Sequence, residues 1–418
     1  DAQESRGLGD VYKRQQLICN VIGQSLGQDY YPATGTDANK NLKAVDTWKL
    51  VDVGKDVEEL SKKDVFTKTL MIQLGNYYFD NRIYSSDLPP IFRDTMEYGG
   101  YILRTRLGLY EVENDPKWDL TNGKDYSADE HTPVLPKTYA KLFEELKALR
   151  IKYTMYNDTL MEAMTSWEMM DKFIAQIEVA YQNTITIMLE AISMQLVCSA
   201  IAISDKATGT ARHLLTEAKS KGLLGTEATA EDFLKSEDCI KYALMEIKKT
   251  KSYMKKFTVA FNNKTTPSFT PVEDNELMML TSFTAQASNI LASVYHNNEF
   301  DLGNFYETPW WQATATEVSS VQKFNDITTN SAVKITADET KKLGIGTKEY
   351  NGQYIIGLMY DRLAIGIAER AGNKVTSSYT ACADFWNMFD HHALNAWVDS
   401  AYTVSYTHLR AHETPEHL

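Results

Sequence analysis

The feature that most constrains this chain is a helical pattern over residues 165–204. Apolar or small side chains recur there in steps of three or four, which places them on one face of a long helix. They are Ile177, Tyr181, Ile185, Met188, Ile192, Leu196, Ser199 and Ile203. Thr165 and Glu168 have the spacing of a capping box, which predicts where the helix begins. A helix of this length is on the order of 50 Å long, so we expect a rigid spine that organises the rest of the chain.

The same run raises the alternative of a membrane-spanning helix, because residues 185–203 approach the length of about 20 residues that a bilayer requires. Glu190 and Gln195 interrupt this stretch, and no cluster of Lys or Arg flanks its start. The chain also has no second apolar span that could shield these polar groups from lipid. We therefore predict a helix buried by protein on several sides, and no membrane partner.

Composition predicts a soluble globular protein with two or three lobes, because the 418 residues are 43% hydrophobic and 24% charged. Lys and Arg total 43 against 56 Asp and Glu, a formal net charge of −13, which argues against a broad nucleic-acid-binding surface. The four cysteines are far apart in sequence: Cys19, Cys198, Cys239 and Cys382. This spacing indicates neither a disulfide framework nor a zinc site, and it favours a reducing cytoplasm.

Both ends of the chain look foreign to the rest of it. Residues 1–15 and 404–418 resemble translated sequencing-adapter tails, and we leave them out of the fold prediction as one would a tag. This also removes His408, His412 and His417 from consideration as metal ligands.

The first part of the chain lacks a core of its own. Residues 16–97 are predicted to form an N-terminal arm with leading helices, including a short helix over residues 66–84. Residues 98–112 alternate in the manner of a β-strand, and a second strand is predicted at residues 150–156, after a short amphipathic helix at residues 138–149. Residues 98–156 would therefore form an extended loop that projects onto a neighbour.

After the spine, residues 231–257 are predicted to be helical, with the lysines between Lys248 and Lys256 on a solvated face. Residues 276–295 are predicted to form another helix. Asn351-Gly352 is the strongest short hairpin signal, and strands are expected around it and near the C-terminal end of the chain.

Two glycines lie in the apolar stretches that follow this hairpin signal, Gly357 and Gly366. In a strand interior, a close backbone approach explains a glycine better than a dinucleotide fingerprint does. The stretch LGIGTK at residues 343–348 does not match the phosphate-loop pattern, and no G-x-S-x-G motif occurs.

One cluster of carboxylates and histidines is close in sequence. It consists of Asp384, Asp390, His391 and His392. The adjacent histidines point in different directions on a helix or a strand, so they lack the i,i+4 spacing that two metal ligands on one helix face require. We predict a structural role for this cluster, no catalytic, cofactor-binding or metal-binding residue, and no enzymatic activity.

The order of elements and several stretches resemble the major capsid protein of tailed bacteriophages, in the version of short-tailed phages, with the fold shared by herpesvirus shells. The stretches are IKYTMYNDTLMEAMTSWEMMDKFIAQIEVAYQNT, PSFTPVEDNELMMLTSFTAQASNILASVY and YIIGLMYDRLAIGIAERAGNKVTSSYTACADFWNMF. The resemblance implies an α+β fold with an N-terminal arm, an extended β-hairpin loop, a peripheral domain and a mixed α/β axial domain. On this chain the implied peripheral domain with its spine helix is 157–206, the axial domain is 207–350, and 351–403 holds the return strands.

The resemblance also implies a function. Proteins of this family are structural: copies form hexamers and pentamers of an icosahedral shell that encloses double-stranded DNA, with scaffolding and portal proteins as further partners. The protein would be located in the virion and assembled in the host cytoplasm. The hairpin and the arm lie across adjacent subunits in such shells, and a net negative charge suits a shell that holds DNA without specific binding. Arg104 and Arg106, on one face of the predicted strand, are expected to form intersubunit ion pairs.

Two other classes of function stay open at this point. An encapsulin-like nanocompartment shell protein shares the fold and would enclose enzymes instead of DNA. A carbohydrate-binding or hydrolytic protein would explain the aromatic content of 11%, but it needs paired carboxylates in a cleft, and the sequence nominates no such pair.

Overall fold

The computed structural model describes residues 30–32, 43–45, 91–96, 101–107, 138–143, 146–206, 211–262, 267–295, 305–308, 311, 333–344, 346–352, 354–370, 374–399 and 404–408. The helices in these ranges are α4 (Asn157–Ala163), α5 (Trp167–Lys206), α6 (Leu214–Ser220), α7 (Ala230–Lys235), α8 (Glu237–Met254), α9 (Thr281–Tyr295) and α10 (Ala337–Lys342). The strands are β1 (Tyr30–Pro32), β2 (Lys43–Val45), β3 (Phe92–Met96), β4 (Ile102–Leu107), β5 (Thr138–Phe143), β6 (Leu146–Tyr156), β7 (Ala211–His213), β8 (Asn275–Leu280), β9 (Tyr306–Thr308), β10 (Val333–Ile335), β11 (Tyr350–Gly352), β12 (Ile355–Asp361), β13 (Ile365–Arg370), β14 (Lys374–Thr380), β15 (Phe385–Val398) and β16 (Val404–His408).

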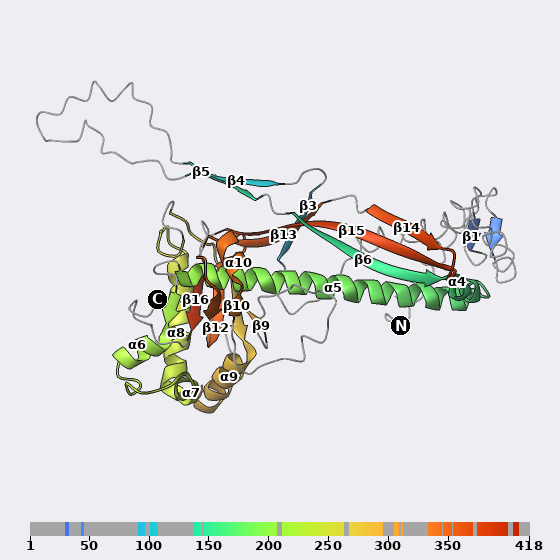
Figure 1. The fold of residues 1–418 in the computed structure, drawn as a ribbon. Helices are drawn as coiled ribbons and strands as arrows, with labels where there is room; N and C mark the ends of the chain where they lie inside the picture. Colours follow the sequence, from blue (N-terminus) through green and yellow to red (C-terminus); the bar gives the residue numbers. More distant parts are fainter. Residues whose placement is uncertain are drawn as a thin grey trace, which may run out of the picture.

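The predicted spine is confirmed as helix α5, which has 40 residues and is therefore about 60 Å long. It runs through the molecule with the sheets and the other helices arranged along it (Figure 1). Its start differs from the predicted capping box by one residue. The Ser166 hydroxyl accepts a hydrogen bond from the Met169 amide at 3.2 Å, while Glu168 forms an ion pair with Lys172 at 2.6 Å. Ser166, and not Thr165, therefore caps the helix.

Burial of α5 increases along its length. The first half buries one face, whereas in the second half the consecutive residues Leu196, Val197 and Cys198 are all buried, although successive residues of a helix point in different directions. By length and composition alone α5 could cross a membrane, but 67% of its most apolar window is buried inside the protein. The predicted burial by protein on several sides is confirmed.

The long sheet covers one side of α5, and β15 is its central strand (Figure 1). One edge of β15 pairs with β6 along eleven residue positions, from Phe385 opposite Tyr156 to Asn395 opposite Leu146. The other edge pairs first with β14 and then with β13, and β3 adds a parallel strand outside β13. A strand paired on both edges along most of its length gives the sheet a rigid axis parallel to the helix.

The short sheet has the strand order β7-β16-β12-β8-β9, and helices α6 to α9 form the helical lobe on one of its sides. Strands β8 and β12 are buried at every position. Met278 and Leu358 join the hydrophobic cluster around α5, whereas Met279 and Met359 join the cluster within the helical lobe. Because successive side chains alternate between faces, these two strands connect both cores.

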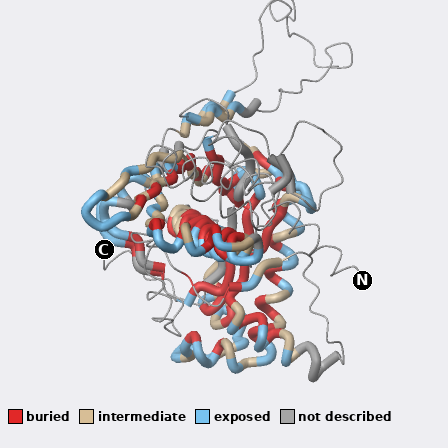
Figure 2. Tube along the Cα trace, turned by 90° about the vertical axis from the view of Figure 1, so that its right-hand side faces the viewer, coloured by how far each residue is buried: buried red, intermediate tan, exposed pale blue. Residues whose placement is uncertain are grey.

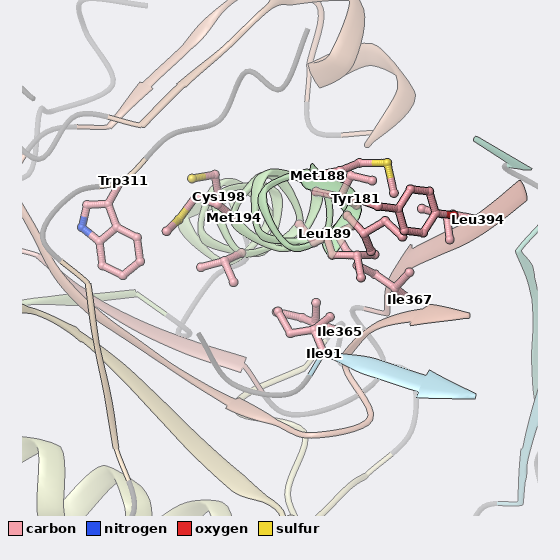
Figure 3. Close-up of a cluster of buried hydrophobic side chains, with 14 of the residues drawn as sticks. Ile91, Tyr181, Met188, Leu189, Met194, Cys198, Trp311, Ile365, Ile367 and Leu394 are labelled. Atoms are coloured by element: carbon pink, nitrogen blue, oxygen red, sulfur yellow. The ribbon is translucent and has the colours of Figure 1, made fainter. Parts of the chain in front are cut away.

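The larger core lies between α5 and the sheets. Ile365 and Ile367 of β13 and Leu394 of β15 point toward Leu189 and Tyr181 of the helix (Figure 3). Each fully buried aliphatic side chain of this kind contributes roughly 1.5–3 kcal/mol. Figure 2 shows the outcome: buried residues follow the helix and the strands, and exposed ones lie on the outer elements.

Two predicted helices are wrong in whole or in part. Residues 138–143 form β5 and residues 146–149 form the start of β6, because pairing of β5 with β4 and of β6 with β15 overrides the helix preference of their Leu and Lys residues. Residues 276–280 belong to β8, and helix α9 begins only at Thr281. Six consecutive buried residues look alike in a buried strand and a buried helix, so periodicity could not separate the two.

The predicted Asn351-Gly352 hairpin turn is also wrong. Both residues lie inside β11, where Asn351 is opposite Lys334 of β10. The turn toward β12 instead contains Tyr354, with a positive φ of 56°. Strands β10 and β11 pair with each other and pack into the α5 cluster through Val333 and Tyr350, so this part of residues 207–350 lies apart from the core of the helical lobe.

The C-terminal tail differs from the expectation that it takes no part in the fold. Residues 404–408 form β16, which lies between β12 and β7 in the short sheet. Strand pairing uses backbone groups, so a stretch that was set aside for its side-chain sequence can still complete a sheet. The foreign origin of residues 1–15 and 404–418 stays a prediction. The predicted helix at residues 66–84 lies outside the described residues.

Candidate functional site

Strands β4 and β5 form a two-stranded antiparallel hairpin that stands outside the main body (Figure 1). Within the described ranges neither strand pairs with a further strand. A hairpin of two strands is at best marginally stable by itself in water, so the contacts of its two faces decide what it can do.

The inner face of β4 is held by Arg104. Its Nη1 donates a hydrogen bond to the Leu363 carbonyl oxygen at 2.5 Å, and its guanidinium lies 4.6 Å from the centre of the Trp397 ring. A planar guanidinium can donate in its own plane while it stacks on an aromatic face. Arg104 therefore connects the hairpin to the turn before β13 and to the end of β15.

The inner face of β5 is held by Asp399, which is fully buried. The Tyr139 hydroxyl donates to Asp399 Oδ1 at 3.2 Å, and Lys141 Nζ lies 3.6 Å from the same oxygen. The Asp399 amide donates to the Ala364 carbonyl oxygen at 2.7 Å, which fixes the carboxylate relative to β13. The base of the hairpin is thus anchored through both of its strands.

The outer face of the hairpin is apolar and uncovered. Tyr101, Leu103 and Leu142 are 62%, 58% and 44% exposed, and Leu103 lies directly opposite Leu142. Exposed apolar side chains that sit together on a sheet face indicate an interaction surface. We call this set the outer hairpin face.

The sequence led to the expectation that Arg104 and Arg106 form ion pairs with a neighbouring copy. Arg104 lies on the inner face and contacts its own chain. Arg106 lies opposite Tyr139 in the register, and its side chain is outside the described residues. The apolar side chains that alternate with the arginines in the sequence are the ones that point outward. The intersubunit ion pairs of Arg104 and Arg106 stay a prediction.

A second cluster lies at the centre of the long sheet and joins it to the spine. His392 lies on β15, and its Nδ1 is 2.8 Å from Glu369 Oε1 on β13. Its Nε2 is 3.1 Å from Oδ2 of Asp390, which also lies on β15. The Tyr181 hydroxyl of α5 donates to that Asp390 oxygen. All four side chains are buried. We call these residues the buried charge cluster.

The buried charge cluster carries a protonated histidine. Burial by itself lowers the pKa of His392, but hydrogen bonds to Asp390 and Glu369 outweigh it and raise this pKa to about 9. Burial likewise raises the pKa of Asp390, and hydrogen bonds from His392 and Tyr181 reverse the effect and lower it. The result is an imidazolium between two carboxylates, which connects α5, β13 and β15.

Only part of the cluster flagged in the sequence comes together. Asp390 and His392 meet, because residues two apart point to the same face of a strand. His391 points to the other face, where it is exposed and lies 3.0 Å from the Thr376 hydroxyl. Asp384 lies in the turn between β14 and β15 and accepts a hydrogen bond from the Tyr379 hydroxyl at 2.6 Å. Sequence analysis missed Glu369 and Tyr181, for which no local signal existed.

The stability of the folded chain should fall as pH rises above neutrality. The folded pKa of His392 is raised above its ordinary 6.5, so its contribution is complete below pH 6.5 and is lost as pH rises through about 9. Between pH 7 and pH 9 we expect a loss of about 2 kcal/mol, measured by urea unfolding. The same pH series with His391→Leu should keep the slope. An unchanged unfolding midpoint between pH 7 and pH 9 would contradict the charged state of His392.

Metal ligands and cysteines provide no further candidate functional site among the described residues. Across the ranges that the structure covers, no group of three or more His, Cys, Asp or Glu side chains is arranged to hold a metal ion. Cys198, Cys239 and Cys382 are free thiols, and Cys19 is outside the described residues.

Comparison with known proteins gives a family for most of the chain. Residues 32–400 match the family described as Phi29-like phage major capsid protein. Among solved structures, a chain from the capsid of Staphylococcus phage Andhra has a TM-score of 0.47 and 8% identity, over 79% of this chain and 88% of that chain. A chain from the head fiber and inner core protein gp22 structure of bacteriophage P68 has a TM-score of 0.45 and 10% identity, over 77% and 83%. One from the mature capsid of bacteriophage PhiM1 has a TM-score of 0.41 and 7% identity, over 77% and 86%. No curated protein sequence matches this chain.

Proposed function

Because this chain belongs to the Phi29-like phage major capsid protein family and is a structural capsid protein of a tailed bacteriophage, we propose that its copies form hexamers and pentamers of an icosahedral shell around double-stranded DNA. Self-assembly of identical copies and a place in the virion follow from the capsid role. Scaffolding and portal proteins as partners, and assembly in the host cytoplasm, are parts of the same proposal.

The parts of the fold are assigned within this proposal. The extended loop would include β4 and β5 but end at Phe143, because β6 is paired with β15 in the long sheet. The peripheral domain would comprise the long sheet with α4 and α5, and the axial domain would comprise the short sheet with the helical lobe. The separate hydrophobic clusters around α5 and within the helical lobe support this division.

The observation that carries the proposal is the outer hairpin face. A single chain leaves Tyr101, Leu103 and Leu142 in water on a hairpin whose described anchoring contacts all lie on its inner face. Covering these side chains with a neighbouring copy would remove apolar surface from water at roughly 25 cal/mol per Å². The hairpin thus has an anchored inner face and an exposed apolar outer face, which suits a contact between subunits.

The combined change Leu103→Lys and Leu142→Lys tests this contact. Both side chains are exposed, so the free energy of unfolding of the separate chain should change by less than about 1 kcal/mol. Shell yield, counted by negative-stain microscopy and sedimentation, should fall sharply because two buried charges would have to enter the contact. The matched control Leu103→Ile keeps the face apolar and should assemble normally. Shells at wild-type yield from the lysine variant would refute the contact.

The two arginines can be tested separately. Arg104→Glu removes contacts with Leu363 and Trp397 of the same chain, so it should loosen the hairpin as well as any contact with a neighbour. Arg106→Glu is the sharper test of an ion pair with a neighbouring copy. Reduced shell yield with an unchanged unfolding midpoint would support that pair, and unchanged yield would reject it.

Neither alternative function gains support. The family match favours a phage shell over a nanocompartment shell. A hydrolytic site would need two carboxylates in a cleft, whereas Asp390 and Glu369 are buried and both contact His392. The formal net charge of −13 is consistent with a shell that encloses DNA without gripping it.

A further inference from the structure

The lysine-rich end of helix α8 is an exposed surface that takes no part in the contact proposed for the outer hairpin face. Lys248, Lys249, Ser252 and Tyr253 are exposed along one side of α8, opposite the side that packs into the helical lobe. These positions follow the three- and four-residue steps of a single helix face. The sequence predicted a solvated lysine face, but the structure adds exposed aromatic side chains to it.

The aromatic side chains form a patch at the end of α8. Tyr253 and Phe257 are each 51% exposed and Phe269 is 44% exposed. The rings of Phe257 and Phe269 lie 4.8 Å apart, held by the backbone bridge between Thr258 and Ser268. Two large exposed rings that contact each other at a tilted angle, instead of entering the core beside them, indicate a preformed contact surface.

Lysines surround this patch. Lys255 and Lys256 are exposed next to Phe257, and Lys249 lies 5.9 Å from the Tyr253 ring centre. Among the described residues no carboxylate forms an ion pair with Lys248, Lys255 or Lys256, whereas Lys249 reaches Glu246 at 3.4 Å. An apolar centre with a basic rim has the composition of a protein-binding surface whose partner is acidic. We call Tyr253, Phe257, Phe269 and these lysines the basic patch.

The same lobe presents an acidic counterpart at the opposite end of α8. Its exposed carboxylates are Glu227, Glu231, Asp232, Glu237 and Asp238, which outnumber the single lysine of the segment, Lys235. Two of them form ion pairs within the lobe, Glu231 with Lys235 at 3.9 Å and Glu237 with Lys241 at 2.5 Å. Leu223, also exposed, adds an apolar side chain beside them. Helix α8 has 18 residues and is about 27 Å long, which exceeds the Debye length of about 8 Å at physiological salt. The two charged ends therefore do not neutralise each other within one chain.

We propose that the basic patch of one copy docks on the acidic segment 227–238 of a second copy. Opposite charges at two different places on one molecule produce a head-to-tail contact, which closes into a ring when the rotation between copies allows it. The helix dipole accounts for acidic residues at the start of α8 and lysines at its end, but it does not account for the exposed rings. A DNA duplex would satisfy the lysines and leave the rings in water, so the second copy is the better partner.

This proposal rests on the assembly of identical copies and is independent of the outer hairpin face. The test is a charge swap in the full-length chain. Lys248→Glu with Lys256→Glu should lower the yield of shells and rings at least about tenfold. Adding Glu227→Lys with Glu231→Lys in the same chain should restore yield to near the wild type. As matched control, Lys341→Glu with Lys342→Glu reverses two exposed lysines of α10 and should assemble normally.

Unchanged yield after the first reversal, or loss without rescue, would overturn the pairing. Shells at normal yield with less packaged DNA would show a nucleic-acid contact and would overturn it as well. A disulfide cross-link tests the contact directly and does not depend on the yield of shells. In a Cys382→Ser background, which removes an exposed thiol, Lys256→Cys combined with Glu231→Cys should give disulfide-linked oligomers under mild oxidation. The two positions flank α8 at its opposite ends, and a helix of 18 residues is about 27 Å long, which exceeds the reach of a disulfide. A chain that stays monomeric in assembled shells therefore refutes the contact.

Discussion

Replacing His392 with leucine should lower the free energy of unfolding by about 3–5 kcal/mol, because it leaves Asp390 and Glu369 buried without their shared cation. The imidazolium lies within 3.1 Å of one carboxylate and 2.8 Å of the other. Its removal also loosens the link to Tyr181, the α5 residue that donates to Asp390. Urea unfolding of the full chain, followed by circular dichroism, measures the change.

The adjacent residue gives a matched control. His391→Leu makes the same chemical change one position away on the exposed face of β15 and should alter the free energy of unfolding by no more than about 0.5 kcal/mol. In the His392→Leu chain, the extra changes Asp390→Asn and Glu369→Gln should recover part of the loss, since they remove the unpaired charges. Equal unfolding midpoints for the His391 and His392 variants would contradict the role of the cluster.

Replacing Gly366 with alanine should destabilise the chain by about 3 kcal/mol, at the upper end of the range for overpacking in a core. A Cβ at this position would lie 2.7 Å from two atoms of the Trp397 indole. Trp397 is buried, and the Arg104 guanidinium lies over its ring, 4.6 Å from the ring centre. To make room for the Cβ, the indole has to move, which disturbs its contact with Arg104 of β4. We therefore also expect faster proteolysis near β4 and β5.

Gly225→Ala is the control for this substitution. No atom lies within 4 Å of a Cβ built at Gly225, so alanine there should be neutral or stabilise slightly by lowering the entropy of the unfolded chain. Thermal unfolding of both variants, with limited proteolysis of the folded state, separates the effects. If Gly366→Ala unfolds at the wild-type temperature, the indole is not held as tightly as its contacts indicate.

Patterns that repeat along the chain were enough to predict several elements. The three- and four-residue steps from Ile177 to Leu196 predicted α5, and the apolar runs predicted β12 and β13. The interpretation of Gly357 as a close backbone approach is confirmed, since a Cβ there would lie 2.9 Å from the Met278 carbonyl oxygen. At Gly366 the space is taken by the Trp397 side chain and not by a backbone. These features depend on side chains a few residues apart or on one residue type.

Features that depend on distant partners were missed or inverted. The alternation of Leu103 with Arg104 showed that the two point to opposite faces of a strand, but it could not show which face meets the body. Trp397 and Leu363 decide this, because they offer a stacking surface and an acceptor for a guanidinium. The helix predicted at residues 138–149 failed for the same reason, since Asp399 and the edge of β15 hold that stretch extended.

The sequence by itself thus determined a long buried helix, a mixed helix and strand composition, and a resemblance that the family match confirms. Only the tertiary structure decided which side of the hairpin is left for a neighbour, and which carboxylates enclose His392. The physical reason is that periodicity reports the relative directions of nearby side chains, whereas burial and pairing depend on residues more than a hundred positions away, such as Tyr181 with Asp390 and Arg104 with Leu363.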